Sequence, residues 1–459
     1  MIIRNSFINI KFNIAFKSKK EVGMKKILVI MLALFLAVPA ISYAGSVTSR
    51  WDVTIGGYLM FETGYNTQGI GSSTHNAVRS GYLGSQNQFD ETGNFFMSAG
   101  QTELNFLIKG PDAWGAKTMA FLSGDFTGQW SGTNHGTFDM KFAFIKMNWP
   151  TSSLTIGQVP AVTANLPTWS GNVLNFSSTT PFNKGTPNTQ QIMFKQNFAK
   201  NWFFDIGVQT AGMNGAGVGG TQNNNWSNSG MPQLAGDIGW NTDSCGKVGP
   251  WNMLFSLGGF VGQSKEQYIS QVAAAGAPQK WNSKNVTAWL VEFKSTIPII
   301  PMKKENKAGA FLASFNAFTS QNADSQLNFV PATGALAYTY GNARNPSDAT
   351  APVISGGLAH LQYYLTNQVF VNGFYGYYRQ NWSNAQGGQL AGTNGRMMNN
   401  QQIIANIMYD VNPAIRMGFE YTNTYTRYAG LQEITAGTGQ YYDSKGTNHS
   451  FRIGAIYFF

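Results

Sequence analysis

Apolar and polar side chains alternate residue by residue along many stretches of this chain. The pattern is clearest at 448–459, where every second residue is apolar or aromatic: Phe451, Ile453, Ala455, Tyr457 and Phe459. Successive side chains of a β-strand point to opposite faces of a sheet, so this period of two predicts a strand with one apolar face. Such a strand could cover the core of a soluble protein. It could also face lipid, with its terminal aromatic rings at the membrane interface.

The same alternation predicts about sixteen strands along the chain. In 284–296, for example, Trp289 and Phe293 lie on one face and Glu292 and Lys294 on the other. The predicted strands are 53–65, 97–109, 115–126, 139–148, 153–158, 190–197, 201–210, 232–241, 251–263, 284–296, 308–320, 353–366, 368–380, 400–410, 413–425 and 447–459.

Two of these segments, 115–126 and 139–148, alternate less regularly than the others. Phe121 and Ile145 fall on the face that is otherwise polar. Either these strands face a packed or trimeric surface, or the register of the predicted strands shifts within them.

The connectors between the predicted strands alternate in length. The short ones are 110–114, 149–152, 199–200, 367 and 411–412, with somewhat longer ones near Pro250 and at 297–307. The long ones are 66–96, 127–138, 159–189, 211–231, 264–283, 321–352, 381–399 and 426–446. Outer-membrane barrels have short periplasmic turns, long extracellular loops and an even number of strands, whereas a soluble β-sandwich has no reason to alternate its loops. We therefore predict an all-β fold, a transmembrane antiparallel β-barrel of about 16 strands with short periplasmic turns and long extracellular loops.

Composition supports this prediction over a helical membrane protein or an ordinary soluble one. Charged residues make up 11% of the chain and aromatic residues 14%, while the mean hydropathy is slightly negative at −0.18. Soluble proteins contain about 25% charged residues. A low charge content combined with many aromatic residues and modest hydropathy is typical of an outer-membrane barrel.

The N-terminal region predicts export. Met24-Lys25-Lys26 precedes an apolar run over 27–41 and the small-residue site Ser42-Tyr43-Ala44, which together are typical of a secretory signal peptide. The apolar run is short for a transmembrane anchor and contains a proline near its end. We expect 24–44 to be the signal peptide, cleaved after Ala44, and 1–23 to be an upstream extension from a misplaced start codon. Residues 45–459 then form a single barrel domain in the cell outer membrane.

The basic charge of the chain does not predict a nucleic-acid partner. The formal net charge is +10, but the first 44 residues contain seven of the 31 basic and one of the 21 acidic residues, which leaves about +4 for the rest. Its basic residues are scattered and form no patch or motif. Cys245 is the single cysteine, so we expect neither an internal disulfide nor a structural metal site, and no cofactor is predicted.

A barrel of this size encloses water, because side chains cannot fill its interior. Segment 159–189 is the candidate constriction loop folded into the lumen, although it could also be an ordinary surface loop. It contains no acidic residue and one basic residue, Lys184. Charged rings set ion selectivity in pores, so a nearly uncharged constriction predicts weak selectivity with a slight preference for anions. Sugars or other neutral solutes could also pass.

Charged and polar residues on the inward faces are the candidate pore-lining residues. Arg452 and Glu420 could either set selectivity or simply pair with each other across adjacent strands. The complete predicted set is Glu62, Glu103, Asn105, Lys109, Lys117, Asp125, Lys184, Arg416, Glu420 and Arg452.

Short motifs in 97–158 resemble those of Gram-negative porins, and their pattern is most similar to that of the DcaP-like trimeric porins. They are K-G at 109–110, G-D-F at 124–126 and T-I-G-Q at 155–158. The resemblance implies a sixteen-stranded homotrimer with an inserted third loop that takes up small, often anionic, solutes. This chain departs from the family in two respects. It has Gln101 and Glu103 where the family strand tends to be rich in Arg, and it has no helical segment before the barrel.

Together these features predict an outer-membrane porin for passive, weakly selective diffusion of small hydrophilic solutes and ions. Its expected partners are outer-membrane lipid, two further copies in a homotrimer, and the barrel-assembly machinery, which would recognise the strand that ends at Phe459. An enzyme is not predicted, because the mid-strand residue His360 is better explained as lining the lumen than as a base. The alternatives are a specific channel for small anionic or sugar solutes and a barrel that encloses a surface-binding or electron-transfer partner.

Overall fold

The computed structural model describes residues 52–67, 93–126, 138–160, 172–175, 188–210, 231–271, 280–321, 353–381, 397–428 and 445–459. All of them belong to one unit, Trp51–Phe459. The predicted signal peptide 24–44, its cleavage site after Ala44, and Lys184 lie outside the described residues.

Every regular element in the described residues is a β-strand. The strands are β1 (Asp52–Asn66), β2 (Asn94–Ser98), β3 (Glu103–Lys109), β4 (Lys117–Asp125), β5 (Asp139–Asn148), β6 (Ser152–Pro160), β7 (Asn188–Ala199), β8 (Trp202–Gln209), β9 (Gln233–Thr242), β10 (Met253–Gln271), β11 (Lys280–Ile300), β12 (Phe311–Gln321), β13 (Val353–Tyr364), β14 (Val369–Asn381), β15 (Met397–Asn412), β16 (Ile415–Tyr428) and β17 (Lys445–Phe458).

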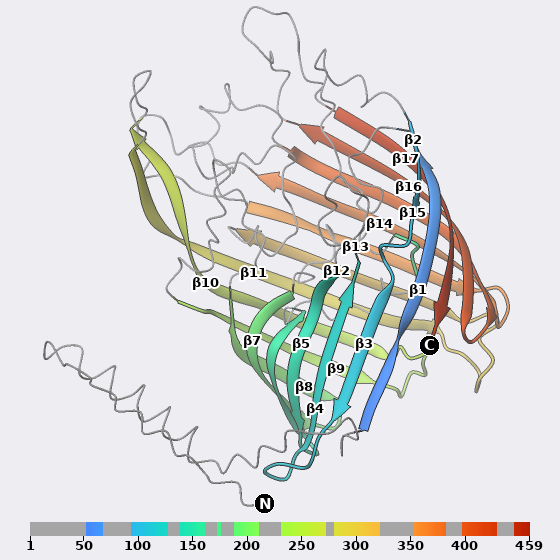
Figure 1. Ribbon diagram of the computed structural model, residues 1–459, viewed down its shortest axis with the longest axis horizontal. Helices are drawn as coiled ribbons and strands as arrows, with labels where there is room; N and C mark the ends of the chain where they lie inside the picture. The colour runs from blue at the N-terminus through green and yellow to red at the C-terminus, as the bar shows by residue number, and fades with distance from the viewer. Residues whose placement is uncertain are drawn as a thin grey trace, which may run out of the picture. The chain divides into compact units, whose positions relative to one another are not determined.

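These strands pair antiparallel with their neighbours in chain order, and the sheet closes on itself because β1 pairs with β17 (Figure 1). The closing register runs from Tyr58 opposite Phe458 to Asn66 opposite Ser450. Strands β2 and β3 both pair with β1, so they are two parts of one barrel strand interrupted at 99–102. The fold is therefore a closed antiparallel β-barrel of sixteen strands, as predicted.

Two strands extend well beyond their predicted ends. The sequence predicts strands over 251–263 and 284–296, whereas β10 and β11 remain paired as far as Gln271 opposite Lys280 (Figure 1). The additional residues are mostly polar in sequence and carry no period-two signal. Their strand structure comes from pairing within the hairpin, because cross-strand backbone bonds do not require an apolar face.

The two faces of the barrel wall differ in the way that the alternation predicts. On β17, Ile453 is 56% exposed on the outer face, while the adjacent Arg452 is fully buried on the inner face. Ile403, Met417 and Phe419 are likewise exposed on the outer face of β15 and β16. Outward apolar side chains in such number mark a surface that meets lipid or another protein. Among the described residues, no helix has the length and apolar character needed to cross a membrane.

A β-bulge explains the irregular alternation in 139–148. The register between β4 and β5 shifts between Ser123 and Gly124, and Lys141 is the extra residue on β5. A bulge moves the following side chains to the opposite face. Ile145 is consequently 56% exposed on the outside.

On β4 the register is regular, and Phe121 lies on the same inward face as Asp125. Its ring packs against Phe142 and Phe144 of β5, with centroid distances of 6.3 and 5.5 Å. The inner wall of the barrel thus carries an aromatic cluster here. Phe121 breaks the alternation because it belongs to this cluster, not because it faces a neighbouring subunit.

Candidate functional site

The four described residues 172–175 lie within segment 159–189 and contact inward-facing side chains of the barrel wall. Glu420 on β16 accepts hydrogen bonds from two consecutive backbone N–H groups, Leu174 N at 2.8 Å and Asn175 N at 3.2 Å. The Glu420 side chain is fully buried. Hydrogen bonds to an ionised group are stronger than neutral ones, so this carboxylate is the main polar attachment of these residues to the wall.

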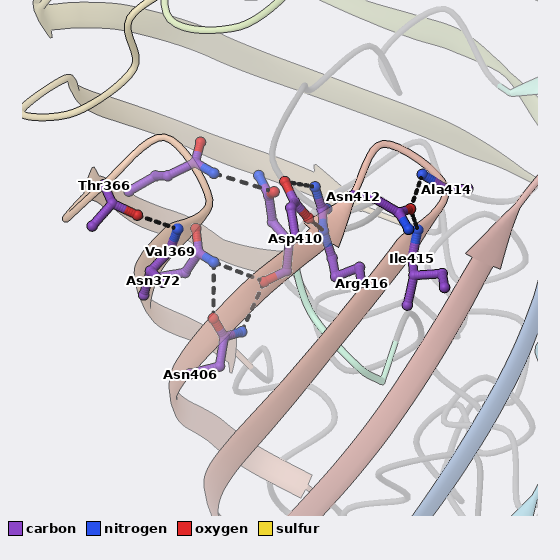
Figure 2. A network of polar contacts seen from close by, with 11 residues as sticks. Thr366, Val369, Asn372, Asn406, Asp410, Asn412, Ala414, Ile415 and Arg416 are labelled. Atoms are coloured by element: carbon purple, nitrogen blue, oxygen red, sulfur yellow. Dashed lines mark hydrogen bonds and ion pairs between the residues drawn. The ribbon is translucent and has the colours of Figure 1, made fainter.

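Amide side chains of three neighbouring strands hold Asn172. Its carbonyl oxygen accepts from Asn372 of β14 at 3.2 Å and from Asn406 of β15 at 2.8 Å, and its Oδ1 accepts from Gln362 of β13 at 3.3 Å. Asn372 also donates to Asn406, so the two amides lie side by side on the wall (Figure 2). Asn406 completes the network by donating to Glu420 at 3.1 Å.

Apolar contacts reinforce this polar network. Val173 and Leu174 are fully buried. A Cβ atom added to Gly454 would lie 2.9 Å from Leu174, so the absence of a side chain at that position makes room for the leucine. Leu174 belongs to a cluster that includes Met60, Phe370, Met408 and Ile456, and Val173 belongs to another that includes Phe260, Leu290, Phe374 and Ile404. The inner wall therefore carries apolar patches that the sequence did not predict.

A buried ion pair lies beside the same residues. Arg452 Nη1 donates to Glu62 Oε2 at 2.7 Å, and their side chains are 0% and 1% exposed. Gln101, in the break between β2 and β3, donates both to Glu62 at 2.8 Å and to the Leu174 carbonyl at 3.0 Å. Glu420 stands directly opposite Arg452 in the β16–β17 register. Three predicted pore-lining residues, Glu62, Glu420 and Arg452, thus point inward but are covered.

A second cluster on the inner wall is more accessible. Lys141 Nζ lies 2.6 Å from Glu103 Oε2 and 3.2 Å from Asp125 Oδ2. The side chains of Lys141, Glu103 and Asp125 are 21%, 13% and 9% exposed. Asn105, two residues after Glu103 on β3, is half-buried on the same face. The structure thus brings together two of the predicted site residues, Glu103 and Asp125, around a lysine that the sequence analysis did not select, and places Asn105 on the same face.

A third cluster lies on β7, β8, β9 and β11. Lys294 Nζ lies 2.9 Å from Asp237 Oδ2, and both side chains are almost completely buried. Lys195 Nζ lies 3.8 Å from Asp205 Oδ2 and 3.9 Å from the centroid of the Phe203 ring. Asp205 and Asp237 are register partners on adjacent strands, so the two carboxylates face inward side by side.

The remaining predicted basic residues within the described part of the chain lie near the end of the barrel where the connectors are short, and each is paired with an acidic neighbour. Lys109 and Lys117 are largely exposed, whereas Arg416 is mostly buried and its guanidinium lies above the Phe370 ring. Figure 2 shows Arg416 beside its partner where β15 turns into β16. The three pairs are Lys109–Asp52 at 2.7 Å, Lys117–Asp112 at 2.7 Å and Arg416–Asp410 at 2.5 Å.

The sequence analysis missed Gln101, Lys141, Asp237 and Lys294 as site residues. Lys141 was missed because the bulge at this residue interrupts the alternation, so the sequence pattern does not assign its side chain to either face. Lys294 does fall on the predicted polar face of 284–296, and that alternation was the available signal. Its partner Asp237 also falls on the polar face of the predicted strand 232–241, but the contact between the two could not be predicted, because it joins two strands separated by β10.

His360 lies on the inner face of β13, as the alternation predicts, but it is covered and does not line the lumen as the sequence analysis expected. Its ring is 1% exposed and stacks on Phe374 with a centroid distance of 4.1 Å. Its Nε2 lies 3.1 Å from Asn372 Oδ1. These contacts cover the ring, which packs in the wall beside residues 172–175.

No protein-family model matches the chain, and no curated protein matches its sequence. Solved structures do match its fold. The outer-membrane channel DcaP of Acinetobacter baumannii superposes with a TM-score of 0.64 at 14% identity, covering 89% of this chain and 97% of that one. OmpF of Salmonella typhi, in complex with daunomycin, gives a TM-score of 0.50 at 11% identity and covers 89% of this chain and 97% of that one. The chain therefore has the fold of the DcaP channel and of other outer-membrane porins, as the motifs in 97–158 predict.

Proposed function

We propose that this protein is an outer-membrane porin, a water-filled channel through which small hydrophilic solutes and ions diffuse passively. The observation that carries the proposal is the closed sixteen-stranded sheet with apolar residues outside and charged residues inside. A closed barrel leaves no unpaired edge in lipid, and one of this size encloses water. Export would follow cleavage after Ala44, and the barrel-assembly machinery would recognise the strand that ends at Phe459.

The proposed constriction is segment 159–189, including Lys184. Its support is the attachment of residues 172–175 to Glu420 and to the amides of β13, β14 and β15. These bonds draw the middle of the segment across the inner wall, where it narrows the lumen. The rest of the segment would then complete the narrowest ring.

Weak selectivity follows from the pairing of the inward charges. The described clusters each combine acidic and basic side chains: Glu62 with Arg452, Glu103 and Asp125 with Lys141, Asp205 with Lys195, and Asp237 with Lys294. A charged ring selects ions through its net field, which opposite charges within a few ångströms largely cancel. Among the predicted pore-lining residues, Glu103, Asn105 and Asp125 are those best placed to meet a solute.

Recording from the mature protein in planar lipid bilayers tests the channel directly. We expect stepwise conductance, with steps in groups of three for the proposed homotrimer, and a small reversal potential in a potassium chloride gradient. A folded preparation, confirmed by circular dichroism, that gives no conductance in repeated insertions would overturn the proposal. A large reversal potential would instead overturn weak selectivity.

The outer apolar face predicts a strong effect of charge at mid-strand. Ile453→Arg should destabilise the folded barrel in lipid vesicles by about 2–4 kcal/mol, because Arg on the lipid face of a barrel costs that much near the bilayer midplane. Thr447→Arg is the matched control, since Thr447 lies on the same outer face of β17 close to its long-connector end. We expect about 0–1 kcal/mol there. Equal urea midpoints for the two variants would show that Ile453 does not face lipid.

A further inference from the structure

Three basic side chains gather on the outer face of the barrel, at the ends of β14, β16 and β17. Arg379 lies two residues before the end of β14, Arg427 lies one residue before the end of β16, and Lys445 begins β17. All three side chains are exposed. These strand ends adjoin the long connectors, so the three residues lie at the end of the barrel that we assign to the cell exterior.

The pairing register places the three residues in one row across four neighbouring strands, β14 to β17 (Figure 1). Arg379 is opposite Asn399 of β15, Asn399 is opposite Arg427, and Arg427 is opposite Lys445. Register partners point to the same face of a sheet. Because neighbouring strands are about 4.8 Å apart, Arg427 and Lys445 are adjacent, and Arg379 starts about 10 Å from Arg427. The Asn399 amide lies between the two arginines.

The strands that carry this row do not neutralise its positive charge. They contain two acidic residues, and both are engaged elsewhere: Asp410 pairs with Arg416, and Glu420 binds residues 172–175 inside the barrel. Neither arginine of the row has an acidic partner in the part of the chain that the structure describes. The row is therefore a concentrated positive charge on the outside of the barrel wall.

Aromatic side chains cover the outer face next to the row, towards the middle of the barrel. Tyr375 and Tyr377 of β14 are 48% and 37% exposed, and Phe451 of β17 is 42% exposed. Tyr425 of β16 is opposite Gln401, which is the register partner of Tyr377. Aromatic rings on the outside of a barrel mark the level at which the hydrocarbon ends and the lipid headgroups begin. In the outer membrane, the basic row therefore lies at the depth of the headgroups of the outer leaflet.

We propose that the row of Arg379, Arg427 and Lys445 binds the phosphate groups of the phosphorylated glycolipid of the outer leaflet, lipopolysaccharide. An arginine can donate two parallel hydrogen bonds to one phosphate, and the Asn399 amide can donate another between the two arginines. Cations spread along a row suit a headgroup that carries more than one phosphate. The inference uses the proposed orientation of the barrel, with its long connectors outside, and does not require the channel to conduct.

The test measures the binding of diphosphoryl lipid A, the phosphorylated anchor of that glycolipid, to the folded protein in a nonionic detergent. A fluorescent derivative of the lipid reports binding through its anisotropy. We expect saturable binding, for which lipid A without its phosphates competes at least about tenfold less well than the diphosphoryl form, because the charge-assisted hydrogen bonds are lost. Raising sodium chloride from about 0.05 to about 0.5 M should weaken binding, because salt screens the attraction between exposed charges.

A charge-removing double variant identifies the proposed contacts. Arg379→Gln combined with Arg427→Gln should weaken the binding of diphosphoryl lipid A about 25-fold, since one basic residue at an anionic lipid surface contributes about fivefold. Lys200→Gln combined with Lys247→Gln is the matched control, because it removes the same charge from two exposed lysines in short connectors at the opposite end. The control should bind as wild type does. Circular dichroism should show a folded barrel for both variants, because all four side chains are exposed.

Several results would overturn this inference. They are binding that the removal of the phosphates or added salt does not weaken, and wild-type affinity in the arginine double variant. An oligomer that forms without lipid and is lost in that variant would also overturn it, since the row would then contact a second copy of the chain. The phosphate and salt dependence are measured on the wild-type protein, so they decide the question even if the variant does not fold. Because binding is measured in detergent, a negative result would leave the proposed channel untouched.

Discussion

Glu420→Ala is expected to raise the single-channel conductance on the order of twofold, since a wider constriction carries more ions. The substitution removes the acceptor of the Leu174 and Asn175 backbone N–H groups and of the Asn406 amide. Each hydrogen bond to a charged group contributes about 1.5–3 kcal/mol, so the polar attachment of residues 172–175 would be largely lost. The segment should then leave the wall for part of the time, and larger solutes should pass. Planar-bilayer recordings and liposome-swelling rates for sugars of increasing size measure both effects.

Two comparison variants separate loss of the attachment from loss of a charge. Glu103→Ala removes another inward carboxylate, but its partners are Lys141 and other side chains of the wall, not residues 172–175. It should change the reversal potential more than the conductance. Glu420→Gln keeps one acceptor oxygen and should fall between wild type and Glu420→Ala. A Glu420→Ala channel with wild-type conductance and size limit would show that this carboxylate does not position the constriction.

The architecture was predictable because each strand carries its own signal. The outer faces of β15, β16 and β17 carry runs of apolar residues at alternate positions, and the closing strand contributes Phe451 and Tyr457 to the outer face. The alternating connector lengths then determine the order and the closure. Apart from the closing pair of β1 with β17, the sheet neighbours are consecutive in the chain, so their pairing requires no knowledge of contacts between distant residues.

The site was predictable only as a set of inward positions. The alternation predicts that Glu62, Glu420 and Arg452 face inward. It does not predict that they are covered, because the covering residues 172–175 lie more than 240 positions from Glu420 along the chain. The local pattern holds no information about such a contact. Ile404 shows the same limit of the local pattern. This apolar residue lies on an otherwise polar face of the wall, and it packs in a cluster with Val173.

Arg452→Met is expected to destabilise the folded barrel by about 3–5 kcal/mol, because it leaves the Glu62 carboxylate buried without its cation. The pair is 2.7 Å long, and its side chains are 0% and 1% exposed. Glu420, opposite Arg452 in the register, would lose a neighbouring positive charge as well. Urea unfolding in lipid vesicles, followed by tryptophan fluorescence, measures the change.

The control is a pair of the same type in an exposed position. Lys109 and Asp52 are 2.7 Å apart, but their side chains are 57% and 60% exposed. Breaking an exposed pair costs about 0–1 kcal/mol, because water replaces the lost partner. Lys109→Met should therefore unfold close to the wild-type urea midpoint. If Arg452→Met also unfolded close to the wild-type urea midpoint, water would have to reach the Glu62 carboxylate. The inference that this carboxylate is closely packed would then be wrong.

The single variant Glu62→Gln and the double variant Glu62→Gln, Arg452→Met complete the thermodynamic cycle. Removing both charges eliminates the uncompensated carboxylate, so the double variant should be more stable than Arg452→Met alone. Gln at position 62 can still accept the Gln101 amide that Glu62 accepts now. Recovery of at least half of the lost stability would show that the cost of Arg452→Met comes from a buried charge. If the losses of stability of the two single variants simply add in the double variant, the cost of Arg452→Met comes from the lost contacts of the Arg452 side chain. These include the contact of its guanidinium, 4.5 Å from the centroid of the Phe96 ring.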